Sequence, residues 1–269
     1  MANKENLTLF LWLQGLFPRR LNYYLLIKGL VSSPEDLLNG KTTDPNLSIV
    51  RLTFDMPSGG WISDPESDPL PPSISTSSPC LRVRDPETGA EHWVRESSSI
   101  LEYLEEVYSD KGPSLKPRGL LDSAATHDLV GQINASGAEG TSYLRHVSPQ
   151  FAAFSGLREE ERSPAAARVG YQNSVKALLR VQDWSGKSLA TTGWLTPGVD
   201  GPGLVGVNLA AIRRYVDLVY GGNMFEPEEL KPLEEWYRRF QKLSWWSALE
   251  ERPNVHPPEL KFTIDKIEL

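Results

Sequence analysis

The 269-residue sequence has little of several features that mark particular classes of protein. It holds one cysteine, Cys80, so it cannot form an internal disulfide, and a cytoplasmic location is expected. No apolar run approaches the ~20 residues that a membrane-spanning helix needs. Basic residues number 28 against 35 acidic ones, for a net charge of −7. That balance disfavours nucleic acid and anionic membranes as partners.

The apolar stretch LTLFLWL at residues 7–13 resembles a weak signal peptide. It has neither a basic region before it nor a small-residue cleavage site after it, and PRR follows soon afterwards. We therefore expect a buried strand here. With 39% hydrophobic residues and a mean hydropathy of −0.36, the chain can bury a core and stay soluble in water.

The first part of the chain alternates between strand and helix patterns. A helix is predicted to begin at Pro18, because proline suits a first helical position, and to end at Lys28, before Gly29. Segment 55–78, rich in proline, serine and glycine, is too long for a minimal connection and is typical of functional or mobile loops. Strands are predicted at residues 7–13 and 48–54, and a hairpin at residues 79–85 and 90–95.

A helix is also predicted at residues 97–108, where three consecutive serines are good N-caps and Ser99 with Glu102 has capping-box spacing. Segment 109–119 has the composition of a linker, and beyond it the strand patterns stop. Asn208 is predicted to cap one of the later helices. The later predicted helices are residues 120–146, 159–184, 208–220 and 226–250.

Together these features resemble a cytosolic glutathione transferase over nearly the whole chain. The most specific is Glu96-Ser97 at the start of the helix SSILEYLEEVY; the others are the opening strand-turn-helix unit, Ser78-Pro79 at the family's cis-proline position, and the linker. The resemblance implies an α/β plus all-α fold class. A thioredoxin-like β-α-β / β-β-α domain would span residues 1–112, and an all-helical substrate-pocket domain residues 113–269. The family is usually homodimeric.

The resemblance implies glutathione as cofactor. Ser97, at a helix start, would bind the γ-glutamyl carboxylate, and Glu96 the neighbouring amine. A cis Pro79 would turn the backbone of Ser78 towards the cysteinyl part. The residues alone also allow simpler interpretations, in which Ser97 is an ordinary N-cap, Glu96 is solvated, and Pro79 is a trans proline at a strand start.

The first turn departs from the family pattern. Members usually aim a Tyr, Ser or Cys at the glutathione sulfur, but Phe17 occupies the expected Ser or Cys position. The remaining candidates for activating the thiol are the backbone N–H groups at residues 18–21, the side chains of Arg19 and Arg20, and a hydrogen bond from Gln14. The alternative for both arginines is a solvated helix face.

Four residues are candidates for the substrate pocket: Trp12, Trp61, Tyr143 and His146. The predicted function is attack of the glutathione thiolate on a small, hydrophobic, unsaturated electrophile. The thiol either stays attached, which is conjugation, or leaves after bond rotation, which is cis–trans isomerisation. The form GLFPRR with a long later loop resembles filamentous-fungal members found with secondary-metabolite pathways. The alternative is a non-catalytic ligand-binding protein of the same fold, which Phe17 favours.

Overall fold

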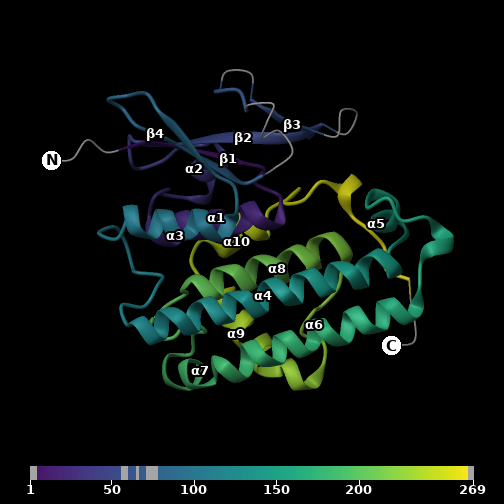
Figure 1. Cartoon of the computed structure of the whole chain (residues 1–269). Helices are drawn as coiled ribbons and strands as arrows, with labels where there is room; N and C mark the ends of the chain where they lie inside the picture. Colours follow the sequence, from purple (N-terminus) through teal and green to yellow (C-terminus); the bar gives the residue numbers. More distant parts are fainter. Residues whose placement is uncertain (1–4, 56–59, 65–66, 71–77, 266–269) are drawn as a thin grey trace. The chain divides into compact units, whose positions relative to one another are not determined.

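The structure is a computed structural model that describes residues 5–55, 60–64, 67–70 and 78–265 (Figure 1). Its internal contacts divide the chain into two units, which are described separately. Unit 1 comprises Met1–Ser114 and Ser244–Arg252, and unit 2 comprises Leu115–Leu243 and Pro253–Leu269. Segment 244–252 therefore groups with the N-terminal residues, although it follows most of the helical region in sequence.

Unit 1 is built on a five-stranded sheet with the order β3-β2-β1-β4-β5. β1 pairs in parallel with β2, and the other pairs are antiparallel. Helices α1 and α3 lie on one face of the sheet (Figure 1). The elements of unit 1 are β1 (Asn6–Leu11), α1 (Leu16–Lys28), α2 (Pro34–Leu38), β2 (Leu47–Asp55), β3 (Gly60–Ser63), β4 (Cys80–Arg84), β5 (Glu91–Val94), α3 (Ser97–Val107) and α10 (Trp246–Glu250).

Every strand and helix predicted before residue 112 is confirmed, with bounds that differ by two residues at most. Two short elements, α2 and β3, were not predicted. The prediction of how α3 begins is wrong. Its N-cap is Glu96, and no side chain there accepts a capping hydrogen bond. Ser97 is the first helical residue, so Ser99 and Glu102 do not form the expected capping box.

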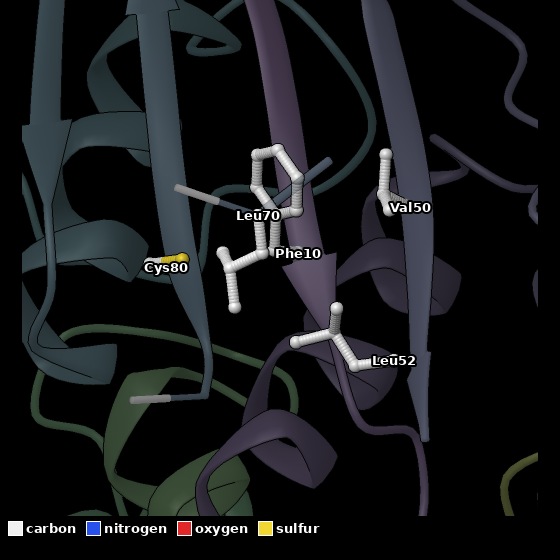
Figure 2. Packing of buried hydrophobic residues seen from close by; sticks show 5 residues of the cluster. All are labelled: Phe10, Val50, Leu52, Leu70 and Cys80. Carbon is white, nitrogen blue, oxygen red and sulfur yellow. The ribbon is translucent and has the colours of Figure 1, made fainter. Parts of the chain in front are cut away.

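The other face of the sheet carries an apolar cluster that includes the single cysteine. Side chains from three neighbouring strands point the same way, and Leu70 lies over them (Figure 2). Period-2 alternation brings Phe10 and Val50 to this face, and Phe10 is opposite Cys80 in the β1–β4 register. The buried members are Phe10, Val50, Leu52, Leu70 and Cys80. Cys80 is therefore a core residue.

Cys80 is expected to resist thiol reagents in the folded chain. Its side chain is 0% exposed, and burial raises the pKa of the thiol to about 12, against an opposing effect of Arg95. Iodoacetamide at pH 8 should leave the native protein unmodified, whereas the same reagent in denaturant should add one carboxamidomethyl group, because only the thiolate reacts. Mass spectrometry distinguishes the two states, and fast labelling of the native chain would contradict this burial.

Unit 2 is helical throughout its described elements. α4 and α6 pack closely where a Cβ on Gly170 would lie 2.8 Å from the backbone nitrogen of Tyr143. None of the helices in the described part of the chain has the length and apolarity that crossing a membrane requires. The elements are α4 (Leu120–Val147), α5 (Pro149–Phe154), η2 (Glu159–Glu161), α6 (Pro164–Trp184), α7 (Gly186–Thr192), α8 (Leu204–Tyr220), η3 (Glu228–Leu230), α9 (Lys231–Phe240) and η4 (Pro258–Leu260).

The predicted helices of this region are present, but three of them have different limits. The predicted helix 159–184 begins as a 3-10 turn and continues as α6, and the predicted helix 226–250 is divided into η3, α9 and α10. Asn208 does not cap α8, which begins four residues earlier. The Asn208 side chain is buried and donates to the carbonyl of Leu204 at 2.8 Å. Thr196 satisfies the helix start by accepting a hydrogen bond from the backbone of Val205.

Candidate functional site

The turn between β1 and α1 is tightly hydrogen-bonded. The backbone N–H of Gly15 donates to the carbonyl of Trp12 at 2.9 Å, and that of Arg19 donates to Gly15 at 3.1 Å. The helix therefore begins at Leu16, and Pro18 is its third residue rather than its first. The N–H groups of Leu16 and Phe17 precede the first helical bond, so they have no acceptor within the helix. They, rather than residues 18–21, are the backbone donors at this helix start.

Glycine is required at position 15 for close approach rather than for an unusual dihedral angle. Its backbone is extended, with φ −71° and ψ 159°. A Cβ at this position would lie 2.7 Å from Cε3 of the Trp12 ring. The Trp12 side chain is thus packed directly against the turn that follows it.

The Ser78–Pro79 peptide bond is cis, as the resemblance implied and against the trans form that residue statistics alone favour. The hydroxyl of Ser78 accepts a hydrogen bond from the backbone N–H of Trp12 at 2.9 Å. The register of β1 with β4 continues from this point, since Phe10 pairs with Cys80. The cis peptide therefore lies beside the C-terminal end of β1, at the same end of the strand as the turn.

The start of α3 meets α1 through a buried arginine. Nη1 of Arg20 donates to the hydroxyl of Ser97 at 3.3 Å, and both residues are buried, with exposures of 1% and 4%. Glu96, just before Ser97, is exposed. Burial lowers the pKa of Arg20 to about 10, while the charge of Glu96 opposes the change, so Arg20 is still a cation at neutral pH.

Both arginines of the first turn are buried, so their interpretation as a solvated helix face is wrong. Arg19 forms an ion pair through Nη1 with both carboxylate oxygens of Glu250, at 2.5 and 2.7 Å. Because Glu250 neutralises Arg19, Arg19 is not available to an anionic ligand. Arg20 is a candidate because it bonds to Ser97 at the start of α3. The guanidinium of Arg20 lies 5.1 Å from the centroid of the Phe17 ring, a cation–π contact.

Phe17 and Gln14 occupy the positions where an activating side chain was sought. The Phe17 ring is 48% exposed and offers no hydroxyl or thiol. Gln14 is partly buried, and its backbone carbonyl accepts a hydrogen bond from Nη2 of Arg19 at 3.2 Å. The groups near this turn that could donate a hydrogen bond to a thiolate are therefore backbone amides and the Arg20 guanidinium, rather than a side-chain hydroxyl at position 17.

Two of the four candidate substrate residues lie together in unit 1. The rings of Trp12 and Trp61 have centroids 5.0 Å apart, and Phe54 packs edge-on against Trp61 at 4.9 Å. Both tryptophans are partly buried and pack against the apolar cluster of Figure 2. They form an aromatic surface directly next to the β1–α1 turn, because Trp12 is the first residue after β1.

The other two candidates, Tyr143 and His146, lie on α4 in unit 2. Tyr143 packs on Tyr171 with ring centroids 5.5 Å apart. Nδ1 of His146 accepts a hydrogen bond from the backbone N–H of Ser163 at 3.2 Å. Burial lowers the pKa of His146, and Arg145 and Arg162 lower it further. A neutral ring that accepts this bond fits a structural role for His146.

Glu250 was not anticipated from the sequence. It is 231 positions away from Arg19, and it lies within what the residue pattern predicts as an ordinary amphipathic helix. No local signal identifies it, since an acidic residue near a helix end is a common surface feature. Among the described residues, no cluster of three or more His, Cys, Asp or Glu side chains could hold a metal ion.

No family model matches the chain, and no curated protein matches it. Several solved structures are similar. FzlA from C. crescentus has a TM-score of 0.59 at 18% identity, over 94% of this chain and 96% of that one. A maleylacetoacetate isomerase from Anaeromyxobacter dehalogenans 2CP-1, with bound dicarboxyethyl glutathione and citrate, has a TM-score of 0.57 at 18% identity, over 95% and 96%.

Glutathione transferase F7 from Populus trichocarpa has a TM-score of 0.58 at 14% identity, over 93% of this chain and 99% of that one. At such identities the likeness concerns the fold alone. The chain has the glutathione transferase fold, with an N-terminal thioredoxin-like mixed sheet and its helices, followed in sequence by an all-helical region. The predicted fold class is confirmed.

Proposed function

We propose that the thioredoxin-like unit binds glutathione and that the chain uses the glutathione thiolate on a small, apolar, unsaturated electrophile. The observation that carries this proposal is the buried Arg20 guanidinium bonded to Ser97 at the start of α3. In the same unit, the cis Ser78–Pro79 peptide adjoins the β1–α1 turn through the bond from Trp12. The donor set suits a zwitterionic peptide with a thiol.

Arg20 and Ser97 would bind the γ-glutamyl carboxylate. A guanidinium matches the two oxygens of a carboxylate, and the first N–H groups of α3 add donors beside it. Glu96 is the exposed carboxylate nearest this point in the chain, and it would pair with the γ-glutamyl amine. The backbone N–H and C=O of Ser78 would align with the cysteinyl peptide, since the Ser78 hydroxyl already bonds to Trp12.

The thiol end would lie at the β1–α1 turn. When bound, glutathione supplies a thiol that, as a thiolate, is a nucleophile for electron-poor double bonds. A free thiol with a pKa of ~8.5 is about 3% ionised at pH 7, and lowering that pKa by ~2 units needs about 2.7 kcal/mol. The amides of Leu16 and Phe17 at a helix start contribute typically 0.3–1 kcal/mol, up to ~2 when partly buried.

The electrophile would contact the aromatic surface of Trp12 and Trp61, which is apolar and adjacent to the turn. Tyr143, on α4 of unit 2, is a further candidate, whereas the hydrogen bond that His146 accepts from Ser163 fits a structural role for that residue. Both conjugation and cis–trans isomerisation are compatible with this site, and the similar solved structures include transferases and an isomerase. The GLFPRR form resembles fungal enzymes of secondary metabolism, among them the glutathione-dependent isomerase of pseurotin biosynthesis. A homodimer is proposed on the resemblance to the glutathione transferase family as a whole.

Ser97→Ala is expected to raise the dissociation constant for glutathione roughly threefold to tenfold, the effect of losing one net hydrogen bond. Calorimetric titration of the full chain measures it. Ser99→Ala is the matched control, because Ser99 lies on the same helix but is exposed, and its affinity should equal that of the wild type. Wild-type protein that gives no heat with millimolar glutathione would remove the proposed function.

A non-catalytic glutathione-binding protein is the second candidate, favoured by the exposed Phe17 ring in the activating position. The ultraviolet absorbance of the thiolate separates the two, when bound glutathione is titrated with pH. A bound thiol with a pKa clearly below its free value supports the enzyme. An unshifted thiol on a chain that still binds glutathione supports the carrier.

A further inference from the structure

Glu250, the last residue of α10, is a fully buried carboxylate in unit 1. Its two oxygens accept hydrogen bonds from Nη1 of Arg19 at 2.5 and 2.7 Å, and Oε1 also accepts one from the hydroxyl of Tyr23 at 3.0 Å. The pKa of Arg19 is raised overall: burial is the largest single effect and lowers it, but the charges of Glu250 and Tyr23 and their hydrogen bonds to Arg19 together outweigh burial. The pair is therefore strongly coupled.

Arg19 connects this carboxylate to the β1–α1 turn. While Nη1 is bound to Glu250, Nη2 donates to the carbonyl of Gln14 at 3.2 Å. Two neighbouring carbonyls are bound from nearby in the chain: that of Leu13 accepts a hydrogen bond from Asn22 at 2.9 Å, and that of Trp12 accepts one from the N–H of Gly15 at 2.9 Å. The carbonyl of Gln14 is thus oriented by a chain of contacts that runs through Arg19 to Glu250 on α10.

Stability alone is a weak reason for such an arrangement. Replacing a buried ion pair with apolar side chains of similar volume is often neutral or stabilising, because desolvation of the two charges offsets their attraction. A second buried pair in the same unit, Lys28 with Glu105 at 3.2 Å, lies at the far end of α1, nine residues from Arg19 or ~14 Å along the helix. The Lys28–Glu105 pair is likewise a buried cation bound to a carboxylate, but it lies away from the β1–α1 turn, so it can serve as a control.

We propose that Glu250 is a positioning residue for the thiol-binding turn. By fixing the Arg19 guanidinium, it orients the Gln14 carbonyl and, through the following peptide bonds, the N–H groups of Leu16 and Phe17. It also neutralises Arg19, so that Arg19 does not itself bind an anion at the turn. The effect on a thiol rests on the proposed function, whereas the effect on the turn does not.

The test compares Glu250→Gln with Glu105→Gln in the full chain. Without ligand, hydrogen exchange of the amides at residues 13–20 should accelerate roughly threefold to tenfold in Glu250→Gln, as for the loss of one net hydrogen bond. Those amides should be unchanged in Glu105→Gln. With glutathione bound, the thiol pKa should rise by roughly half a unit in Glu250→Gln alone, the size of one interaction at a helix start.

The triple variant Arg19→Met/Tyr23→Phe/Glu250→Leu, which also removes the buried Tyr23 hydroxyl that would lose its acceptor, separates position from stability. It removes both charges, so the melting temperature should return to the wild-type value or exceed it, while the faster exchange at residues 13–20 and the raised thiol pKa should persist. Equal exchange in Glu250→Gln and Glu105→Gln, or a thiol pKa that falls, would overturn the positioning role. If the wild-type chain binds no glutathione, the proposed function fails, and the exchange comparison still decides the role of Glu250.

Discussion

Replacing Arg20 with methionine is expected to lower the affinity for glutathione roughly 10- to 150-fold, the range for losing a charge-assisted hydrogen bond. The same change should leave the melting temperature unchanged or raise it. Arg20 is 1% exposed, and burial already lowers its pKa to about 10, so the folded chain holds this cation at a cost. Methionine fills a similar volume without that cost.

The two readouts together identify a binding residue. Replacing a residue that merely supports the fold would lower the stability of the protein. Arg20→Met should instead lower the affinity for glutathione and leave the stability of the protein undiminished. Arg20→Lys should be intermediate, because lysine keeps the charge but not the planar pair of donors. Arg213→Met is the matched control, since Arg213 is buried against the rings of Phe225 and Tyr237 in unit 2. Unchanged affinity in Arg20→Met would remove Arg20 from the site.

The sequence could predict most of the fold because its signals are local. Period-2 and period-3.6 patterns, Gly29 after α1 and the linker composition each act within a few residues. The short elements α2 and β3 carry too few residues for such a period to be visible. The Asn208 prediction failed for a related reason: a good capping residue does not cap when the helix begins earlier, and Thr196 satisfies that start from another segment.

The site could be predicted only in part. Ser78-Pro79 and Glu96-Ser97 follow from short motifs, and the cis peptide is present. The burial of Arg19 and Arg20 could not be predicted, because an arginine on a helix is usually solvated and the partner that buries Arg19 is 231 positions away. Charged pairs at such separations have no sequence period. Such a pair can be identified only from the folded structure, in which Glu250 of α10 contacts Arg19 of α1.

Trp246→Ala is expected to destabilise unit 1 by about 3–5 kcal/mol, the usual cost of deleting a large buried aromatic side chain. Trp246 is 1% exposed and packs on Tyr23 with ring centroids 5.8 Å apart. The ring of Trp245 packs at a tilt against the same tyrosine, with ring centroids 5.1 Å apart. Equilibrium urea unfolding, followed by circular dichroism and by tryptophan fluorescence, measures the change.

Trp184→Ala is the control, because Trp184 is 48% exposed at the end of α6 in unit 2; it should cost about 0.5 kcal/mol or less. A two-unit chain need not unfold in one step. If it unfolds in two, Trp246→Ala should shift only the transition of the thioredoxin-like unit, because α10 belongs to that unit by its contacts. A loss below about 1 kcal/mol would mean that α10 is attached loosely, which would leave Glu250 without the rigid support that its positioning role requires.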